Sequence, residues 1–99
     1  MVFTYILLPE AQEEYEDSVM WYMAKSLETA EHFVNQVDQA LDLISNNPIR
    51  GKSNYANFYE IRIKKFPFSI VYYIEKTLNQ IVVTSIFHDK RNPERKLRN

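Results

Sequence analysis

The sequence predicts an α+β fold in the order β-α-α-β-β-β, with an antiparallel sheet and a helical hairpin packed on one of its faces. Three observations support this prediction. An apolar, β-branched run opens the chain, two stretches with helical periodicity follow, and three strand-like runs with short connections complete it. Short connections favour an antiparallel meander of the last three strands and a hairpin of the two helices. Helices and strands segregated in this way are typical of the α+β class.

The first half of the chain is predicted to hold one strand and both helices. Residues 2–8 are rich in β-branched and aromatic side chains, and Pro9 ends this strand. Pro9 also suits the first turn of a helix, which we expect to reach about Lys25. Ser26 is a suitable N-cap for the second helix, which residues 45–48 end. The apolar residues of this second helix recur at helical spacing: Ala30, Phe33, Val34, Val37, Ala40, Leu41 and Ile44.

The second half is predicted to form a loop followed by three strands. The loop is assigned to residues 50–54, which include Gly51, the only glycine in the sequence. Residues 59–64 alternate strictly between apolar and polar types, so the odd-numbered side chains are expected to face the core and the even-numbered ones solvent. The remaining two strands are expected at 68–75 and 81–87.

Composition favours one domain over residues 1–99. The chain is 45% hydrophobic and 14% aromatic, which is enough apolar material for one core. It has no cysteine, which fits a reducing compartment, and two isolated histidines give no metal-ligand spacing. No glycine-rich phosphate loop is present, so we expect neither a cofactor nor a metal. The apolar start is too short for a signal peptide or a membrane span, and we expect a cytoplasmic protein without membrane association.

The charge of the chain is divided between its two halves. Residues 1–48 carry nine acidic side chains and one basic, whereas residues 49–99 carry eleven basic and four acidic, although the total is −1. Such a division points to an acidic or polyanionic partner on the basic side. The competing interpretation is that the acids only solvate an exposed helix face.

The pattern as a whole resembles a known family. The β-α-α-β-β-β order, with Ala11 in the first helical turn and with Pro48 and Gly51 after the second helix, resembles the RelE/ParE toxins of type II toxin–antitoxin systems. Three segments look like that family's strand pattern and its His-x-x-Arg ending: residues 59–62, 70–72 and 87–93. The resemblance covers essentially the whole chain and is nearer to ParE than to RelE.

The resemblance implies a cytoplasmic, plasmid-stabilising toxin that inhibits growth and is neutralised by a cognate antitoxin. The antitoxin would cover the helical hairpin and the sheet in a hetero-oligomer. The resemblance also implies one of two targets, since RelE-like members cleave mRNA on the ribosome and ParE-like members inhibit DNA gyrase without being nucleases.

Ser69 favours DNA gyrase over ribosome-bound mRNA as the target. RNA cleavage needs a base, cations that stabilise the charged phosphorane and a proton donor. RelE-like nucleases carry an arginine just after an aromatic residue on the middle strand of the meander, where this sequence has Ser69 after Phe68. Residues 89–99 contain neither tyrosine nor histidine. We therefore expect gyrase inhibition by binding rather than an enzyme.

Two alternatives stay open. His88 can exchange a proton near neutral pH, which keeps a ribosome-dependent mRNA endoribonuclease possible. The second alternative is a non-toxic protein-interaction module on the same fold, which an incomplete catalytic set also fits.

Candidate site residues follow from these readings. Target binding is assigned to the cations Arg62, Lys64, Lys90, Arg91 and Arg95. A nuclease would use His88, Arg62 and Arg91 for catalysis. Antitoxin contacts are assigned to Tyr15, Trp21 and Tyr22. Because neighbouring strands lie ~4.8 Å apart, we expect Arg62 and the C-terminal cations to share one surface that the hairpin leaves uncovered; alternatively, these cations only solubilise an open sheet.

Overall fold

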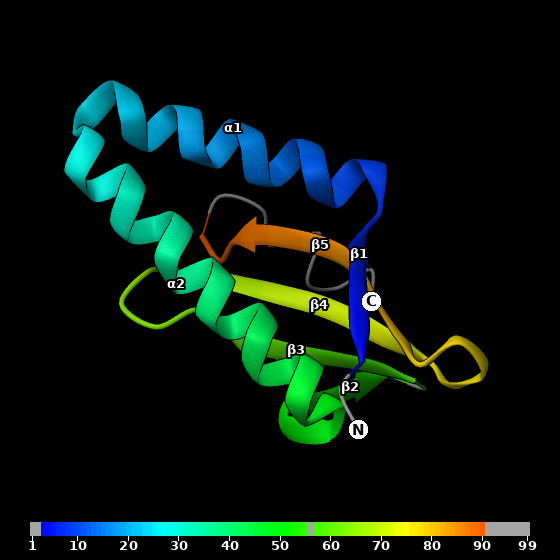
Figure 1. Cartoon of the computed structure of the whole chain (residues 1–99). Helices are drawn as coiled ribbons and strands as arrows, with labels where there is room; N and C mark the ends of the chain where they lie inside the picture. The colour runs from blue at the N-terminus through cyan, green and yellow to red at the C-terminus, as the bar shows by residue number, and fades with distance from the viewer. Residues whose placement is uncertain (1–2, 56, 91–99) are drawn as a thin grey trace.

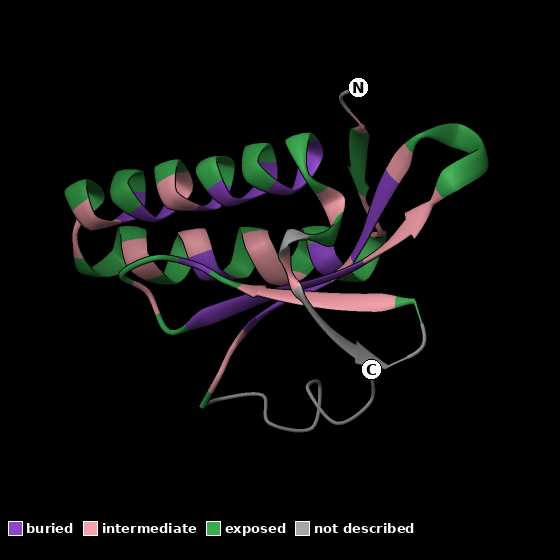
Figure 2. Ribbon diagram, turned by 90° about the horizontal axis from the view of Figure 1, so that it is seen from below, coloured by how far each residue is buried: buried purple, intermediate pink, exposed green. Residues whose placement is uncertain are grey.

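The computed structural model describes residues 3–55 and 57–90 (Figure 1). Within these residues a five-stranded sheet carries a hairpin of two helices on one face, and the hydrophobic core lies between the two layers (Figure 2). The elements are β1 (Thr4–Leu7), α1 (Pro9–Lys25), α2 (Leu27–Asn46), the 3₁₀ helix η1 (Pro48–Arg50), β2 (Lys52–Tyr55), β3 (Phe58–Arg62), β4 (Phe68–Glu75), the 3₁₀ helix η2 (Lys76–Leu78) and β5 (Gln80–His88). No helix in the described part of the chain is long and apolar enough to cross a membrane.

The predicted α+β class and helical hairpin are confirmed. Pro9 occupies the first turn of α1, and the side-chain oxygen of Ser26 accepts a hydrogen bond from the backbone N–H of Thr29 at 3.3 Å. This bond satisfies one of the orphan N–H groups at the start of α2. The predicted apolar stripe of α2 is buried except for Val34, and Phe33 and Ile44 are fully inaccessible.

The sheet is mixed rather than purely antiparallel, which corrects the predicted sheet. Its strand order is β1-β5-β4-β3-β2, and the predicted meander of β3, β4 and β5 is antiparallel. However, β1 pairs with β5 in parallel, with Thr4 opposite Gln80 and Leu7 opposite Val83. The long connection between them, which includes the helical hairpin, lets two strands far apart in sequence run in the same direction.

Residues 50–54, which the sequence assigned to a loop, are instead the end of η1 and most of the edge strand β2. β2 pairs antiparallel with β3, with Lys52 opposite Glu60 and an irregular register near Tyr55. This strand was missed because it is short and has no apolar alternation to reveal it.

Tyr72 holds this edge segment against the sheet. Its fully buried ring places the phenolic oxygen so that it donates to the carbonyl of Pro48 at 2.7 Å and accepts from the backbone N–H of Gly51 at 3.2 Å. Burial raises the pKa of Tyr72, so the phenol keeps its proton for the bond to Pro48. A Cβ at Gly51 would lie 2.7 Å from that phenolic oxygen and 2.9 Å from the carbonyl oxygen of Glu60. Glycine is therefore needed here for close approach of the chain.

Glu14 joins α1 to β5 beyond the end of β1. One of its carboxylate oxygens accepts hydrogen bonds from the hydroxyl of Ser85 at 2.9 Å and from the backbone N–H of Ile86 at 3.0 Å. β1 pairs with β5 only as far as Val83, so the helix supplies the acceptor that a longer β1 would have supplied.

We predict that Gly51→Ala lowers the free energy of unfolding by about 1–3 kcal/mol, the usual cost of overpacking. The cost should be smaller in a Tyr72→Phe background, because phenylalanine lacks the oxygen that the new methyl group would meet. Urea denaturation of both single variants and the double variant measures this coupling. An equal cost of Gly51→Ala in the two backgrounds would contradict the role given to Tyr72.

Candidate functional site

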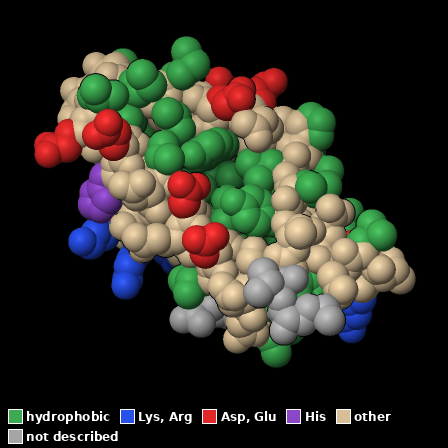
Figure 3. Space-filling view, in the orientation of Figure 1, with side chains coloured by type: hydrophobic (Ala, Val, Ile, Leu, Met, Phe, Trp, Pro, Cys, Tyr) green, Lys and Arg blue, Asp and Glu red, His purple; other side chains and the backbone are tan. Residues whose placement is uncertain are grey.

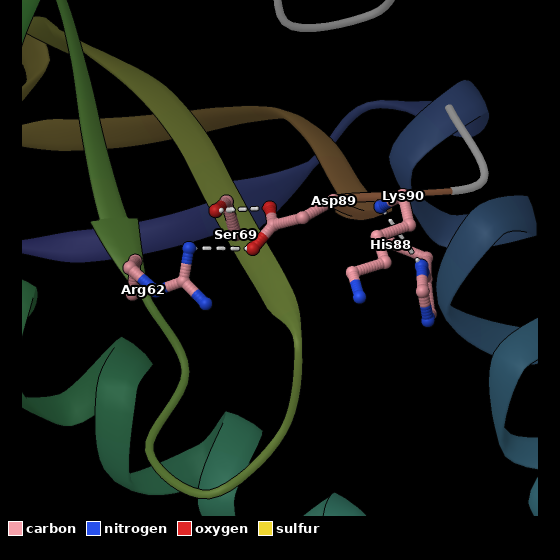
Figure 4. Close-up of polar contacts among 5 residues, drawn as sticks. All are labelled: Arg62, Ser69, His88, Asp89 and Lys90. Carbon is pink, nitrogen blue, oxygen red and sulfur yellow. Dashed lines mark hydrogen bonds and ion pairs between the residues drawn. The ribbon is translucent and has the colours of Figure 1, made fainter. Parts of the chain in front are cut away.

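Three residues form a polar row across one end of the sheet. Arg62 ends β3, Ser69 is the second residue of β4, and Asp89 follows β5 directly. The strand register sets Arg62 opposite Ser69 and Ser69 opposite Phe87. The carboxylate of Asp89 accepts a hydrogen bond from the hydroxyl of Ser69 at 2.8 Å and forms an ion pair with Arg62, whose Nη1 lies 2.6 Å from Oδ2 (Figure 4).

The row is anchored at Asp89. Its side chain is 16% exposed, and its backbone N–H donates to the carbonyl of Pro67 at 2.9 Å. Ser69 is fully buried, whereas the side chain of Arg62 is 63% exposed. An ion pair with so exposed a partner stabilises the fold by only ~0–1 kcal/mol. Its main effect is therefore electrostatic, because a carboxylate of the chain itself partly neutralises Arg62.

His88 lies on the other face of the sheet from Arg62. Its ring contacts Phe68 edge-on at a centroid distance of 5.1 Å, and Phe68 packs against Phe33 of α2. Side chains alternate between faces along a strand, so Ser69 and the row that it joins point away from the hairpin. Nδ1 of His88 accepts the backbone N–H of Lys90 at 3.1 Å, so the histidine caps the turn after β5.

The structure thus brings some of the predicted site residues together and separates others. Arg62 and Lys90 lie at the same end of the sheet, with Lys90 exposed (Figure 4). Arg91 and Arg95 lie outside the described residues. Two of the three residues assigned to nuclease catalysis, His88 and Arg62, lie on opposite faces of the sheet and do not form one cluster. Lys64 is exposed beside α2, in a groove that it shares with Lys65.

The residues assigned to antitoxin binding differ in exposure. Trp21 is 44% exposed, and the ammonium of Lys25 lies 5.1 Å from its ring centroid. Tyr22 packs inward against Phe33 at a centroid distance of 5.1 Å, and Tyr15 contacts the same ring at 6.2 Å. Only Trp21 of the three is therefore mainly a surface residue.

The outer side of the hairpin carries an apolar trough that the sequence analysis missed. Its volume is about 480 Å³, and α1 and α2 line it with Val19, Met23, Leu27, Ala30, Glu31, Val34 and Asn35. Met23 is 52% and Leu27 61% exposed. Figure 3 shows apolar side chains gathered between the helices with acidic ones on both sides. Val34 had been assigned to the core stripe, so helical periodicity alone did not separate the inner from the outer apolar face.

Two tyrosines, Tyr5 on β1 and Tyr15 on α1, lie near the acidic side chain of Asp38 on α2. Burial raises the pKa of both Tyr5 and Tyr15, and the negative charge of Asp38 raises them further. Both phenols are therefore neutral at physiological pH and present apolar ring surface beside acidic neighbours. Among the described residues, no group of three or more histidine, aspartate or glutamate side chains is arranged to hold a metal ion.

A helical hairpin over a mixed sheet is the architecture expected of the small α+β toxins that include RelE and ParE. The family described as ParE toxin of type II toxin-antitoxin system, parDE, matches residues 5–93, and the chain belongs to this family. The prediction of a type II toxin nearer ParE than RelE is thereby confirmed.

Solved structures of such toxins share the fold. The chromosomal ParDE system from P. aeruginosa matches with a TM-score of 0.73 at 13% identity, covering 88% of this chain and 96% of that one. E. coli toxin RelE, in a mutant form in the free state, matches with a TM-score of 0.68 at 16% identity, covering 94% and 90%. The RelBE2 toxin–antitoxin complex from Mycobacterium tuberculosis matches with a TM-score of 0.61 at 17% identity, covering 89% and 99%. No curated protein is similar enough in sequence to match.

We predict that Asp89→Asn strengthens binding of single-stranded DNA, because it frees the charge of Arg62 without changing the shape of the site. One additional phosphate contact should steepen the slope of log Kobs against log salt by about 0.7. Fluorescence anisotropy over a salt series measures the slope. Glu75→Gln removes the same charge at the opposite end of β4 and is the control; equal effects of the two variants would show that only net charge matters.

Proposed function

We propose that this toxin acts by binding DNA gyrase in the cytoplasm and has no nuclease activity. The observation that carries the proposal is the row of Arg62, Ser69 and Asp89. A nuclease would direct an arginine at the scissile phosphate, whereas here a carboxylate already occupies the guanidinium. The serine on β4 is buried and hydrogen bonded to the same carboxylate.

The position of His88 supports the same choice. General acid–base catalysis requires the proton-transfer group and the phosphate-binding cations to reach one substrate atom. His88 instead faces the hairpin side and caps the backbone of Lys90, while Arg62 points to the opposite face. A binding toxin needs no such convergence. We assign target recognition to the exposed cations at this end of the sheet, Arg62, Lys64 and Lys90, continued by Arg91 and Arg95.

We propose further that the cognate antitoxin covers the apolar trough of the hairpin. Exposed apolar surface rimmed by polar residues marks a protein interaction site, and a trough between two helices suits the apolar face of a partner helix. Trp21, Met23 and Leu27 supply large exposed apolar side chains along or beside it. Trp21 is the residue type most enriched among energetic hot spots at interfaces.

The alternative, ribosome-dependent mRNA cleavage, is favoured by one observation. His88 lies two residues from Lys90 and contacts its backbone, so an acid–base group and a cation are adjacent (Figure 4). This pair would have to act without Arg62.

The target is tested by adding purified toxin to a gyrase supercoiling reaction. We expect loss of supercoiling, and a Lys90→Ala/Arg91→Ala double variant should need at least ~10-fold more protein for the same loss, about 1.4 kcal/mol of binding. Lys76→Ala, at the opposite end of the sheet, is the matched control and should inhibit normally. Unchanged supercoiling together with codon-aligned cuts in cellular mRNA would establish the alternative instead.

Antitoxin binding is tested by introducing charge into the trough. Leu27→Glu should weaken the complex by ~30-fold or more, since losing a hot-spot contact costs about 2 kcal/mol. Co-expression then no longer restores growth, while the variant alone remains toxic. Leu78→Glu on η2 replaces an equally exposed leucine far from the trough and should still be neutralised. Full neutralisation of Leu27→Glu would place the antitoxin elsewhere.

A further inference from the structure

β1 lies at one end of the sheet, and no strand of the described chain pairs with its outer side. The strand order begins with β1, whose neighbour is β5. The backbone N–H groups of Thr4 and Leu8 donate to carbonyl groups in or next to β5, at 3.1 and 3.0 Å. Successive backbone groups of a strand point to opposite sides, so the N–H and C=O groups of Tyr5 and Leu7 point outward. An open edge of this kind is a template for another strand.

The side chains of β1 leave apolar surface exposed on both faces of this edge. Ile6 is 42% exposed and Tyr5 is 39% exposed. Leu7 packs against the core under the hairpin, so Tyr5 shares that face of the sheet and Ile6 points to the opposite face. Figure 2 shows β1 as a mostly exposed strand at the end of the sheet. A second strand on this edge would cover apolar surface on both sides.

β1 lacks the features with which natural proteins protect sheet edges. Charged side chains and irregular pairing commonly prevent an edge strand from pairing with another chain. Residues 1–9 contain no charged side chain. The strand at the other end of the described sheet, β2, differs in both respects, because its sequence includes Lys52 and its pairing with β3 is irregular near Tyr55.

We propose that two copies of this chain pair through β1, antiparallel, about a two-fold axis at Ile6. In this register Tyr5 of one copy lies opposite Leu7 of the other, and their outward backbone groups form the hydrogen-bonded pairs. Ile6 lies opposite Ile6 in the non-hydrogen-bonded pair between them, where side chains approach most closely. The two sheets become one continuous sheet, and the interface is self-complementary.

The same register brings together two helix ends of opposite polarity. Pro9, the first residue of α1, comes opposite Phe3 of the second copy. The backbone N–H of Phe3 donates to the carbonyl of Ser45 in the last turn of α2 at 2.9 Å. Strand pairing ends at this point, because the N–H of Phe3 is already used and proline has none. The start of α1 in one copy therefore lies near the end of α2 in the other, where the helix dipoles attract.

A second copy suits this edge better than a strand of a different protein. A partner strand that is recognised by its charge would meet no charged side chain on residues 1–9, whereas a second copy presents the same uncharged, apolar strand. The inference goes beyond the proposed function and holds whichever target the toxin has. β1 lies at the opposite edge of the sheet from β2 and β3, and the apolar trough is lined by the helices, so the pairing uses neither of the surfaces assigned above.

The first test is sedimentation equilibrium of the purified full-length chain, whose mass is 11.9 kDa. We expect a monomer–dimer equilibrium with a dissociation constant of ~10 μM, because the interface is small. Ile6→Lys and Ile6→Glu should each weaken self-association at least ~10-fold, because like charges then lie directly opposite each other at the axis. An equimolar mixture of the two variants should restore the dimer, since lysine then faces glutamate. Met20→Lys, at a 66% exposed position on α1, is the control and should dimerise normally.

A cysteine cross-link tests the register directly. The chain has no cysteine, so Ile6→Cys introduces a single thiol. The Cα atoms of a non-hydrogen-bonded pair lie ~4.5 Å apart, within the range of a disulfide. With oxidised glutathione as the oxidant, Ile6→Cys should form a covalent dimer. Thr4→Cys should not, because the two copies of position 4 are offset by four residues, ~13 Å along the strands.

Three results would each overturn the proposal. The first is a chain that remains a monomer at ~1 mM, a concentration at which even a weak dimer is populated. The second is a mixture of Ile6→Lys and Ile6→Glu that associates no better than either variant alone. The third is equal cross-linking of the two cysteine variants. Circular dichroism of each variant checks that the fold is retained.

Discussion

The pairing of β4 with β3 and β5 is the constraint on which the rest of the molecule depends. β4 is buried from Phe68 to Tyr72, and its register sets Arg62 opposite Ser69 and Phe68 opposite His88. A slip of one residue would exchange the two faces of the strand. Ser69 would then enter the apolar core and Phe68 would point to the polar row. The core and the functional end of the sheet are therefore fixed by the same hydrogen bonds.

An aromatic cluster packs the hairpin against β4 and the β3–β4 turn. Tyr22 of α1, Phe33 of α2, Phe66 of the β3–β4 turn and Phe68 of β4 lie with centroid distances between 4.8 and 6.2 Å. Such offset and edge-on ring pairs add to the stabilisation that burial provides. Phe66 belongs to this cluster and also lines the groove of Lys64 and Lys65. The packing that holds the hairpin on the sheet therefore also positions the turn that carries these two lysines.

The molecule presents three surfaces of different chemistry. The outer side of the hairpin is an apolar trough flanked by acidic side chains. The groove between β3 and α2 is lined by Lys64 and Lys65. At the ends of the strands, the charge of Arg62 is partly neutralised by Asp89. This arrangement explains how a chain with a net charge of −1 offers surfaces of opposite sign. A toxin that must be bound by an antitoxin and also recognise a target has use for surfaces that differ in this way.

The sequence by itself determined the elements whose signals are local. The two helices, the N-cap at Ser26 and the strand at 68–75 follow from periodicity and capping, which act over a few residues. The tertiary structure alone decided the parallel pairing of β1, the edge strand β2 and the partners of Arg62. Each of these depends on contacts between residues far apart in the chain: Tyr72 with Gly51, and Asp89 with Arg62 and Ser69. The sequence shows that Arg62 is a cation, but only the folded structure shows that the carboxylate of Asp89 is paired with it.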